Sequence, residues 1–146
     1  MNLYLDSSAL VKCFIAESSS SDVRELTLDS ELAGTSLITR AETSAAFARL
    51  VRIGGISAES GRAAQRKFLA EWNKLLRVEI NEALIARAET LAWEYSLRGY
   101  DAVQLASALA LQDAIGRPVT LATYDRELWQ ACAPAGLTAW PAKLPR

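Results

Sequence analysis

An apolar run that ends in a carboxylate lies at the start of the chain, where Leu3-Tyr4-Leu5 leads directly into Asp6. A short, uniformly apolar run is typical of a strand buried on both faces of a parallel sheet. Ser7 and Ser8 follow at once, and serine hydroxyls commonly cap helix N-termini. Asp6 is therefore expected at the carboxyl end of a central strand, where open α/β sheets place their ligand sites. Taken alone, Asp6 is explained more simply as a helix cap.

Short apolar strands alternate with helical patterns along the chain. After a strand at 2–5, further strands are expected at about 33–37, 78–80, 118–122 and 136–140. Helices are expected at about 7–15, 20–30, 39–52, 57–76, 81–98, 101–111 and 125–133. This alternation predicts one α/β domain over residues 1–146, with a central parallel sheet of about five strands covered on both faces.

The absence of histidine from the chain narrows the possible chemistry. It excludes Ser-His-Asp and Cys-His nucleophile systems, a histidine general base and the common zinc sites with imidazole ligands. Cys13 and Cys132 are far apart without metal-binding spacing, and are expected to be buried thiols. Any chemistry must therefore come from carboxylates, hydroxyls, lysine, arginine or a metal held by oxygen.

The apolar segments are too short to span a bilayer, and the N-terminus lacks the basic-then-apolar pattern of a signal peptide. We therefore expect a cytoplasmic protein without membrane contact. With a net charge of −1, the chain also lacks the overall basic character of a strong non-specific nucleic-acid binder. Positive charge is nevertheless concentrated between residues 40 and 77. A solvated pair of helices explains this basic middle about as well as a binding surface does.

Three further acids occupy junctions similar to that of Asp6. Glu42 lies in the first turn of the helix after the second strand, Asp101 begins the helix at 101–111, and Asp125 follows the fourth strand. Because parallel strands end at one sheet edge, the four carboxylates are expected to meet in one pocket. Like charges held together need neutralisation, and carboxylates without histidine or thiolate suit Mg²⁺ or Mn²⁺. Each acid taken separately could instead be a cap or a first-turn acid.

A carboxylate-held divalent ion is well suited to phosphate chemistry. Such an ion polarises a phosphoryl oxygen, deprotonates a water and stabilises the leaving oxygen, so that no protein nucleophile is needed. Ser7 and Thr123, each near an acid, are expected to orient a ligand or a metal-bound water.

Four segments, in this order, resemble the PIN-domain ribonucleases, and most closely the VapC-type toxins of prokaryotic toxin–antitoxin pairs. They are Leu3-Tyr4-Leu5-Asp6-Ser7-Ser8-Ala9-Leu10, Arg40-Ala41-Glu42-Thr43-Ser44-Ala45, Tyr100-Asp101-Ala102-Val103-Gln104-Leu105-Ala106-Ser107-Ala108 and Thr123-Tyr124-Asp125-Arg126-Glu127-Leu128. The resemblance covers the whole chain. It implies a three-layer α/β/α fold and Mg²⁺- or Mn²⁺-dependent endonucleolytic cleavage of RNA that leaves a 5′-phosphate and a 3′-hydroxyl.

The same resemblance assigns roles to individual residues and implies partners. Asp6, Glu42 and Asp101 match the core metal ligands of the family, and Asp125 matches its more variable fourth acid. Ser7 and Thr123 match supporting hydroxyl positions. A homodimer and a cognate antitoxin, whose C-terminal segment lies over the active site, are also implied. If the basic middle contacts RNA, the first candidates are Arg49, Arg52, Arg62 and Arg66.

Other protein classes fit the sequence less well. A haloacid-dehalogenase phosphatase needs a second Asp at the position of Ser8, and a receiver-like module needs paired acids after the first strand and a lysine after the last. A catalytically silent PIN-like module that binds RNA or protein is the main alternative, although all four acids are present. Trp72 and Trp93 are expected in the core or a dimer interface, whereas Trp129 and Trp140 are exposed candidates for base stacking.

Overall fold

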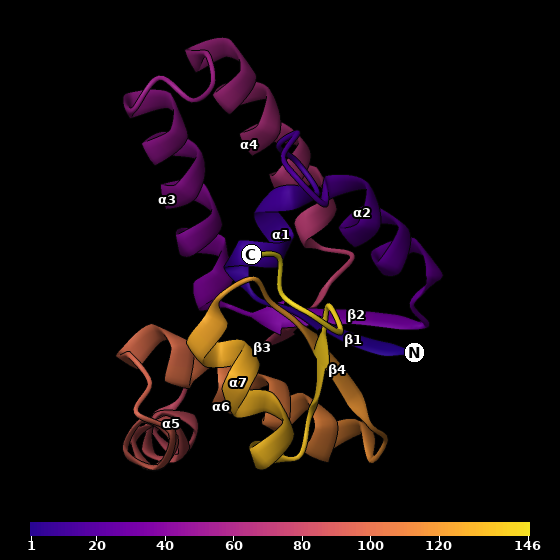
Figure 1. Ribbon diagram of the computed structural model, residues 1–146, viewed down its shortest axis with the longest axis vertical. Coiled ribbons are helices and arrows are strands. Elements are labelled where there is room, and N and C mark those ends of the chain that lie inside the picture. Colours follow the sequence, from indigo (N-terminus) through magenta and orange to yellow (C-terminus); the bar gives the residue numbers. More distant parts are fainter.

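The computed structural model describes all 146 residues, in which strands alternate with helices (Figure 1). The strands are β1 (Asn2–Leu5), β2 (Leu32–Ser36), β3 (Leu76–Val78), β4 (Val119–Ala122) and β5 (Thr138–Trp140). The helices are α1 (Ser7–Lys12), α2 (Ser20–Asp29), α3 (Ile38–Arg52), α4 (Ala58–Trp72), α5 (Glu82–Tyr95), α6 (Gly99–Ile115) and α7 (Arg126–Ala135). None of these helices is both long and apolar enough to cross a bilayer.

The five strands form one parallel sheet in the order β3-β2-β1-β4-β5. Strand β1 lies at the centre, where Asn2 pairs with Leu32 of β2 on one side and with Val119 of β4 on the other. This position explains the uniformly apolar run at the start of the chain, because a central parallel strand is covered on both faces. The predicted α/β class and the five-stranded parallel sheet are confirmed.

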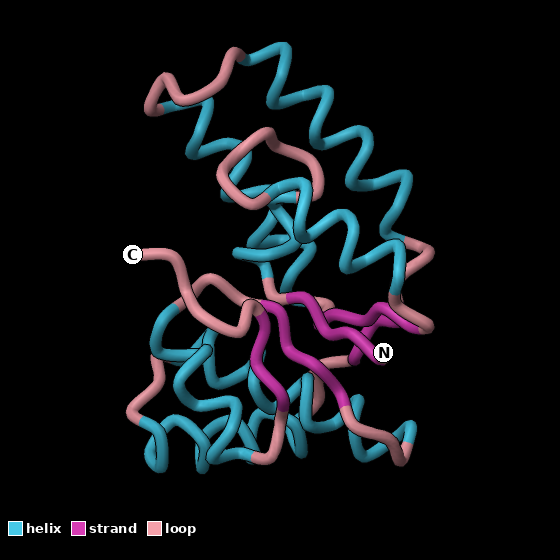
Figure 2. The backbone as a smooth tube through the Cα atoms, turned by 45° about the vertical axis from the view of Figure 1, so that its right-hand side comes forward, coloured by secondary structure: helices cyan, strands magenta, loops and turns pink.

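Helices cover both faces of the sheet and create two separate cores (Figures 1 and 2). Leu3 and Leu5 pack with residues of α1 to α4, whereas Tyr4, which points to the opposite face, packs with residues of α5 to α7. A Cβ atom on Gly34 would lie 2.8 Å from Cδ2 of Leu111, so glycine in β2 allows α6 to lie close to the sheet. These contacts produce the three-layer α/β/α arrangement.

Helices α3 and α4 form a pair that runs side by side away from the sheet (Figure 1). At its base, the buried Phe68 makes edge-to-face contacts with Phe14, Phe47 and Trp72. Near the far end, a Cβ atom on Gly61 would approach Cγ2 of Val51 to 2.5 Å, so glycine allows the two helices to meet closely. The pair is therefore anchored by aromatic packing that includes Trp72, as predicted for that residue.

Several element boundaries differ from those predicted. Helix α1 ends at Lys12 rather than near residue 15, and β3 lies two residues earlier than expected. Helix α5 ends at Tyr95 because Ser96 adopts a left-handed conformation (φ 52°), and α6 already begins at Gly99.

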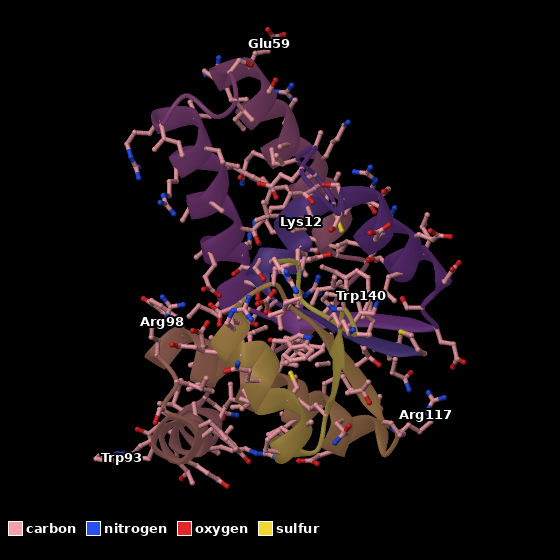
Figure 3. The ribbon with its side chains drawn as sticks, in the orientation of Figure 1. Lys12, Glu59, Trp93, Arg98, Arg117 and Trp140 are labelled. Atoms are coloured by element: carbon pink, nitrogen blue, oxygen red, sulfur yellow. The ribbon has the colours of Figure 1, made fainter.

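The prediction for Trp93 was wrong as far as the core is concerned, since this side chain is 87% exposed. Leu84, Ala88 and Leu91 form the buried stripe of α5, and Trp93 points away from it. Figure 3 accordingly shows Trp93 at the periphery of the molecule. Its predicted place in a dimer interface stays a prediction.

Candidate active site

The four predicted acids follow the carboxyl ends of the central strands. Asp6 directly follows β1, Asp125 comes three residues after β4, and Asp101 lies in the first turn of α6. Glu42 lies just beyond the first turn of α3, because that helix begins one residue earlier than predicted. Each acid therefore reaches the site from a different element, as the parallel topology requires.

Shared hydrogen-bond partners place the acids near one another, because Thr123 contacts Asp6 and the backbone N–H of Asp125, and Arg98 contacts both Asp125 and Asp101. Burial is the main cause of the raised pKa of Asp6, of Glu42 and of Asp101. A neighbouring acid then raises each pKa further: Glu42 acts on Asp6, Asp101 acts on Glu42, and Asp125 acts on Asp101. The structure thus brings together residues that lie more than 100 positions apart in the sequence.

Asp6 is the most deeply buried of the four acids, with 3% of its surface exposed. Its Oδ1 accepts hydrogen bonds from the backbone N–H of Ala9 (2.9 Å) and from the Ser8 hydroxyl (2.7 Å), and its Oδ2 accepts one from Thr123 (2.5 Å). Burial outweighs these three bonds and raises the pKa of Asp6 to about 6. Asp6 therefore caps α1, and its role as a metal ligand stays a prediction.

The hydroxyls beside Asp6 come from Thr123 and Ser8. Thr123 Oγ1 donates to Asp6 and accepts from the backbone N–H of Asp125 (3.0 Å), so it connects two of the acids. Ser8 donates to Asp6 and accepts from the backbone N–H of Tyr124 (2.8 Å). Ser7, the predicted supporting hydroxyl, makes no hydrogen bond to these acids here, and its role stays a prediction. The sequence offered no signal to separate the two adjacent serines.

Gln104 holds Glu42 from within the core. Its side chain is 2% exposed, and its Nε2 donates to Glu42 Oε1 (2.6 Å) and to Thr39 Oγ1 (2.9 Å). Its Oε1 accepts from the Tyr4 hydroxyl (2.5 Å), so the network continues to the central strand. Sequence reasoning missed Gln104, although it is the only amide side chain in the apolar run 102–111.

Arg98 bridges the remaining two acids. Its Nε donates to Asp101 Oδ2 (3.1 Å) and its Nη2 donates to Asp125 Oδ2 (2.9 Å). The sequence placed Arg98 at the end of the preceding helix, but it occupies the N-cap position of α6, and Asp101 is not a cap. Asp125 does cap a helix, because its Oδ1 accepts from the backbone N–H of Leu128 (2.9 Å).

The chemistry of the donor set fits a hard divalent cation. All four acids offer only carboxylate oxygens, their neighbours include hydroxyls and an amide, and three of their pKa values are raised, chiefly by burial and further by a neighbouring acid. However, no group of three or more His, Cys, Asp or Glu side chains is arranged here so that it could hold an ion. Side-chain rearrangement is therefore required before the acids can share one cation.

Hollows of different character lie on either side of the acids. One, of about 680 Å³, is mostly apolar and is lined by residues that include Glu42, Arg98, Tyr100 and Asp101. The other, of about 470 Å³, lies between α1 and α3 and is lined by residues that include Ser7, Ser8, Lys12, Arg49 and Tyr124. We call this second hollow the basic groove.

The predicted RNA-contacting arginines are all exposed, but only one of them lines the basic groove. Arg49 lies in the groove, whereas Arg52 lies at the end of α3, and Arg62 and Arg66 lie on α4. The predicted exposed tryptophans are half-buried instead: Trp129 donates to Pro141 O (2.7 Å) and Trp140 packs edge-to-face on Tyr124.

The chain matches a known protein family over most of its length. Residues 3–133, which carry all four acids, match the PIN domain model. The chain belongs to the PIN-domain family. Ribonuclease VapC45 of Mycobacterium tuberculosis is 33% identical over 142 residues, covering 97% of this chain and 96% of the relative. Ribonuclease VapC47 of the same species is 31% identical, with coverage of 95% and 96%. The resemblance to VapC-type PIN domains is thereby confirmed.

Solved structures agree with the fold of this PIN domain. PAE2754 from Pyrobaculum aerophilum superposes with a TM-score of 0.65 at 20% identity, covering 95% of this chain and 83% of that one. VapBC2 from Rickettsia felis, crystallised with a promoter DNA fragment, gives a TM-score of 0.65 at 16% identity and coverage of 95% and 97%. VapC20 of M. tuberculosis, described as a toxin that cleaves the sarcin–ricin loop, gives 0.63 at 16% identity and coverage of 94% and 97%.

Replacing Gln104 tests whether this buried amide positions Glu42. Gln104→Leu removes the donor to Glu42, a predicted metal ligand, so we expect the Mn²⁺ affinity of this PIN domain to fall about tenfold. Stability should fall by about 1–3 kcal/mol, because buried polar groups lose their partner. Isothermal titration with Mn²⁺ and urea unfolding measure the two effects.

Gln112→Leu provides the matched control on the same helix. Gln112 accepts from Val119 N–H (3.0 Å) and donates to Gly136 O (3.1 Å), far from the acids. This variant should lose stability but keep its Mn²⁺ affinity. Equal Mn²⁺ affinity in wild type and Gln104→Leu would show that Gln104 is structural only.

Proposed function

We propose that this PIN domain is a metal-dependent endoribonuclease and the toxin of a toxin–antitoxin pair, acting in the cytoplasm as one domain over residues 1–146. The observation that carries the proposal is the row of four carboxylates at the sheet edge, in a chain without histidine and with VapC ribonucleases as relatives. Such a site suits hydrolysis by a water molecule and needs no nucleophile from the protein.

Asp6, Glu42 and Asp101 are the proposed ligands of Mg²⁺ or Mn²⁺, and Asp125 is the fourth acid. When bound, the ion supplies positive charge to the phosphoryl oxygens and lowers the pKa of the attacking water. The protein side chains prepare this site. Thr123 and Ser8 fix the orientation of the Asp6 carboxylate, and Gln104 fixes that of Glu42. Ser7 is proposed to contact a ligand from the adjacent groove wall.

The basic groove offers a path for the RNA backbone to the acids. It begins at Ser8, which touches Asp6, and passes Lys12 and Arg49. Lys12 is paired with Glu17 in the same groove, so Arg49 is the unpaired cation that a phosphate meets there. Lys12 Nζ lies 4.5 Å from the centre of the Tyr124 ring, so the two side chains lie on the same wall of the groove. Arg52, Arg62 and Arg66 would contact RNA that continues along the α3/α4 pair.

An antitoxin and a second copy of the chain are the proposed protein partners. The solved relatives include a toxin–antitoxin complex from Klebsiella pneumoniae and the VapBC2 and FitAB assemblies, which supports an antitoxin for this chain. The exposed Trp93 on α5 is a suitable contact for a homodimer, because large exposed aromatic side chains are enriched at interfaces. Sedimentation of the purified protein measures the oligomeric state.

Removal of the metal tests the proposed activity. Purified protein should cleave a pool of cellular RNA in Mg²⁺ or Mn²⁺, leave 5′-phosphate ends, and lose cleavage in EDTA. Sequencing of the 5′-phosphorylated fragments measures both the activity and its target. Cleavage that persists in EDTA would contradict the carboxylate–metal mechanism. Absence of cleavage on every RNA, together with retained RNA or antitoxin binding, would favour the silent binding module instead.

A further inference from the structure

Arg98 occupies the place of a cation between two of the proposed metal ligands. Its guanidinium contacts Oδ2 of Asp101 and Oδ2 of Asp125 at 3.1 and 2.9 Å. Figure 3 shows Arg98 reaching the periphery of the molecule near the carboxyl ends of the strands. The side chain is 73% exposed, whereas those of Asp101 and Asp125 are 16% and 22% exposed. An exposed cation therefore neutralises two largely covered acids.

The two ion pairs are easily broken. Exposed pairs of this kind contribute little to stability, because water and salt screen them and the long arginine side chain loses conformational freedom. The backbone N–H groups near Arg98 do not depend on the guanidinium, since α6 begins without a side-chain cap. The guanidinium can thus leave the acids without disturbing the helix.

Asp125 has one carboxylate oxygen, Oδ2, that does not cap a helix, and Arg98 contacts this oxygen. The other oxygen, Oδ1, caps α7 by accepting from Leu128 N–H. A metal ion that binds Asp125 must therefore take Oδ2, the atom that Arg98 contacts. Arg98 also contacts Asp101 Oδ2, whereas Asp101 Oδ1 does not cap a helix. Arg98 and a divalent ion consequently compete most directly for Asp125 Oδ2.

A released Arg98 remains beside the reaction site. Its backbone is fixed at the N-cap of α6, and its side chain lines the apolar hollow together with Glu42, Tyr100 and Asp101. The planar guanidinium is well suited to bind two phosphate oxygens at once. RNA brings phosphate groups to this position if the proposed function holds.

We propose that Arg98 is an internal counter-ion that a divalent metal displaces and that then binds a phosphate of the RNA substrate. This inference rests on the proposed ribonuclease activity. Without metal, Arg98 neutralises Asp101 and Asp125. With metal bound, Arg98 binds the substrate.

Mn²⁺ affinity tests the role of Arg98 without metal. Isothermal titration should show that Arg98→Gln binds Mn²⁺ about fivefold more tightly than the wild type, because the competing ion pairs are lost. Arg117→Gln is the matched control, because Arg117 is also exposed and also paired with an acid, Glu31, but lies on another side of the molecule (Figure 3). Its Mn²⁺ affinity should equal that of the wild type.

Cleavage kinetics at saturating Mn²⁺ test the role of Arg98 with metal bound. Arg98→Gln should raise KM for RNA about fivefold or more with a smaller change in kcat, and Arg98→Lys should restore part of the loss. Unchanged Mn²⁺ affinity in Arg98→Gln would overturn the displacement, and unchanged KM would overturn the phosphate contact. Failure of the wild type itself to bind Mn²⁺ would instead overturn the proposed metal site.

Discussion

Asp6→Asn is expected to lower metal-dependent RNA cleavage by about three orders of magnitude, or roughly 4 kcal/mol of transition-state stabilisation. Asp6 follows the central strand and is the acid most completely enclosed by the protein. Asparagine retains an oxygen that can accept from the Ala9 N–H but lacks the negative charge that a divalent ion requires. Single-turnover cleavage of a target RNA in saturating Mn²⁺ measures the loss.

The same variant should gain stability relative to the wild type when metal is absent and the pH is high. Burial raises the pKa of Asp6 to about 6, above its ordinary value of 3.8, so the folded wild type binds this proton more tightly than the unfolded chain. The stability of the wild type therefore falls as the pH rises from about 4 to about 6, and stays lower above it. Asparagine does not titrate, so between pH 4 and pH 8 the variant should gain about 2–3 kcal/mol relative to the wild type.

Urea unfolding in EDTA at both pH values measures this difference. Asp22→Asn is the control, because Asp22 is an exposed acid in the first turn of α2 and should show little pH-dependent change. Wild-type cleavage rates in Asp6→Asn would refute the site assignment. A parallel pH dependence in the variant and the wild type would show that Asp6 is not the titrating group.

Phe68→Ala is expected to remove about 3–5 kcal/mol of stability, the usual cost of deleting a fully enclosed aromatic side chain. Phe68 has no exposed surface and touches three aromatic rings, with centroid distances of 5.5 Å to Phe14, 6.1 Å to Phe47 and 5.5 Å to Trp72. These rings join α4 to α3 and to the segment after α1. Because domains of this size are stable by only about 5–15 kcal/mol, the loss approaches the whole margin.

Chemical unfolding followed by tryptophan fluorescence measures the effect, since Trp72 is in direct contact with Phe68. Leu69→Ala is the matched control, because Leu69 is the next residue on the same helix but is 39% exposed. It should cost about 1 kcal/mol or less. Equal losses in the two variants would mean that the aromatic cluster does not anchor the helix pair.

Much of the fold was predictable because burial acts directly on sequence pattern. The run Leu3-Tyr4-Leu5 has no exposed surface on either face of the sheet, which only a central strand allows. Asn81 and Ser57 cap their helices, since side-chain oxygens next to a free helix N-terminus act locally. The positions of the four acids in the fold were predictable for the same reason, because each lies near a junction that strand and helix patterns define.

The parts that were missed depend on contacts between distant residues. Ser8 and not Ser7 reaches Asp6 because of the turn of α1, and no pattern separates two neighbouring serines. Gln104 meets Glu42 across the gap between α6 and α3, which are far apart in sequence. Trp93 is exposed although its helix is amphipathic, because a 3.6-residue period places only one stripe against α6. Which polar groups meet is decided by tertiary packing rather than by local preference.

The central position of β1 also determines when during synthesis the nuclease centre can exist. Strand β1 cannot complete its pairing until β4, its partner more than 110 residues later in the chain, has been synthesised. Thr123 and Asp125, which complete the surroundings of Asp6 and Asp101, are translated later still. A nascent chain therefore carries no assembled acidic centre until Asp125 has been added and has left the ribosome. Under the proposed function, a shorter nascent chain cannot cleave RNA.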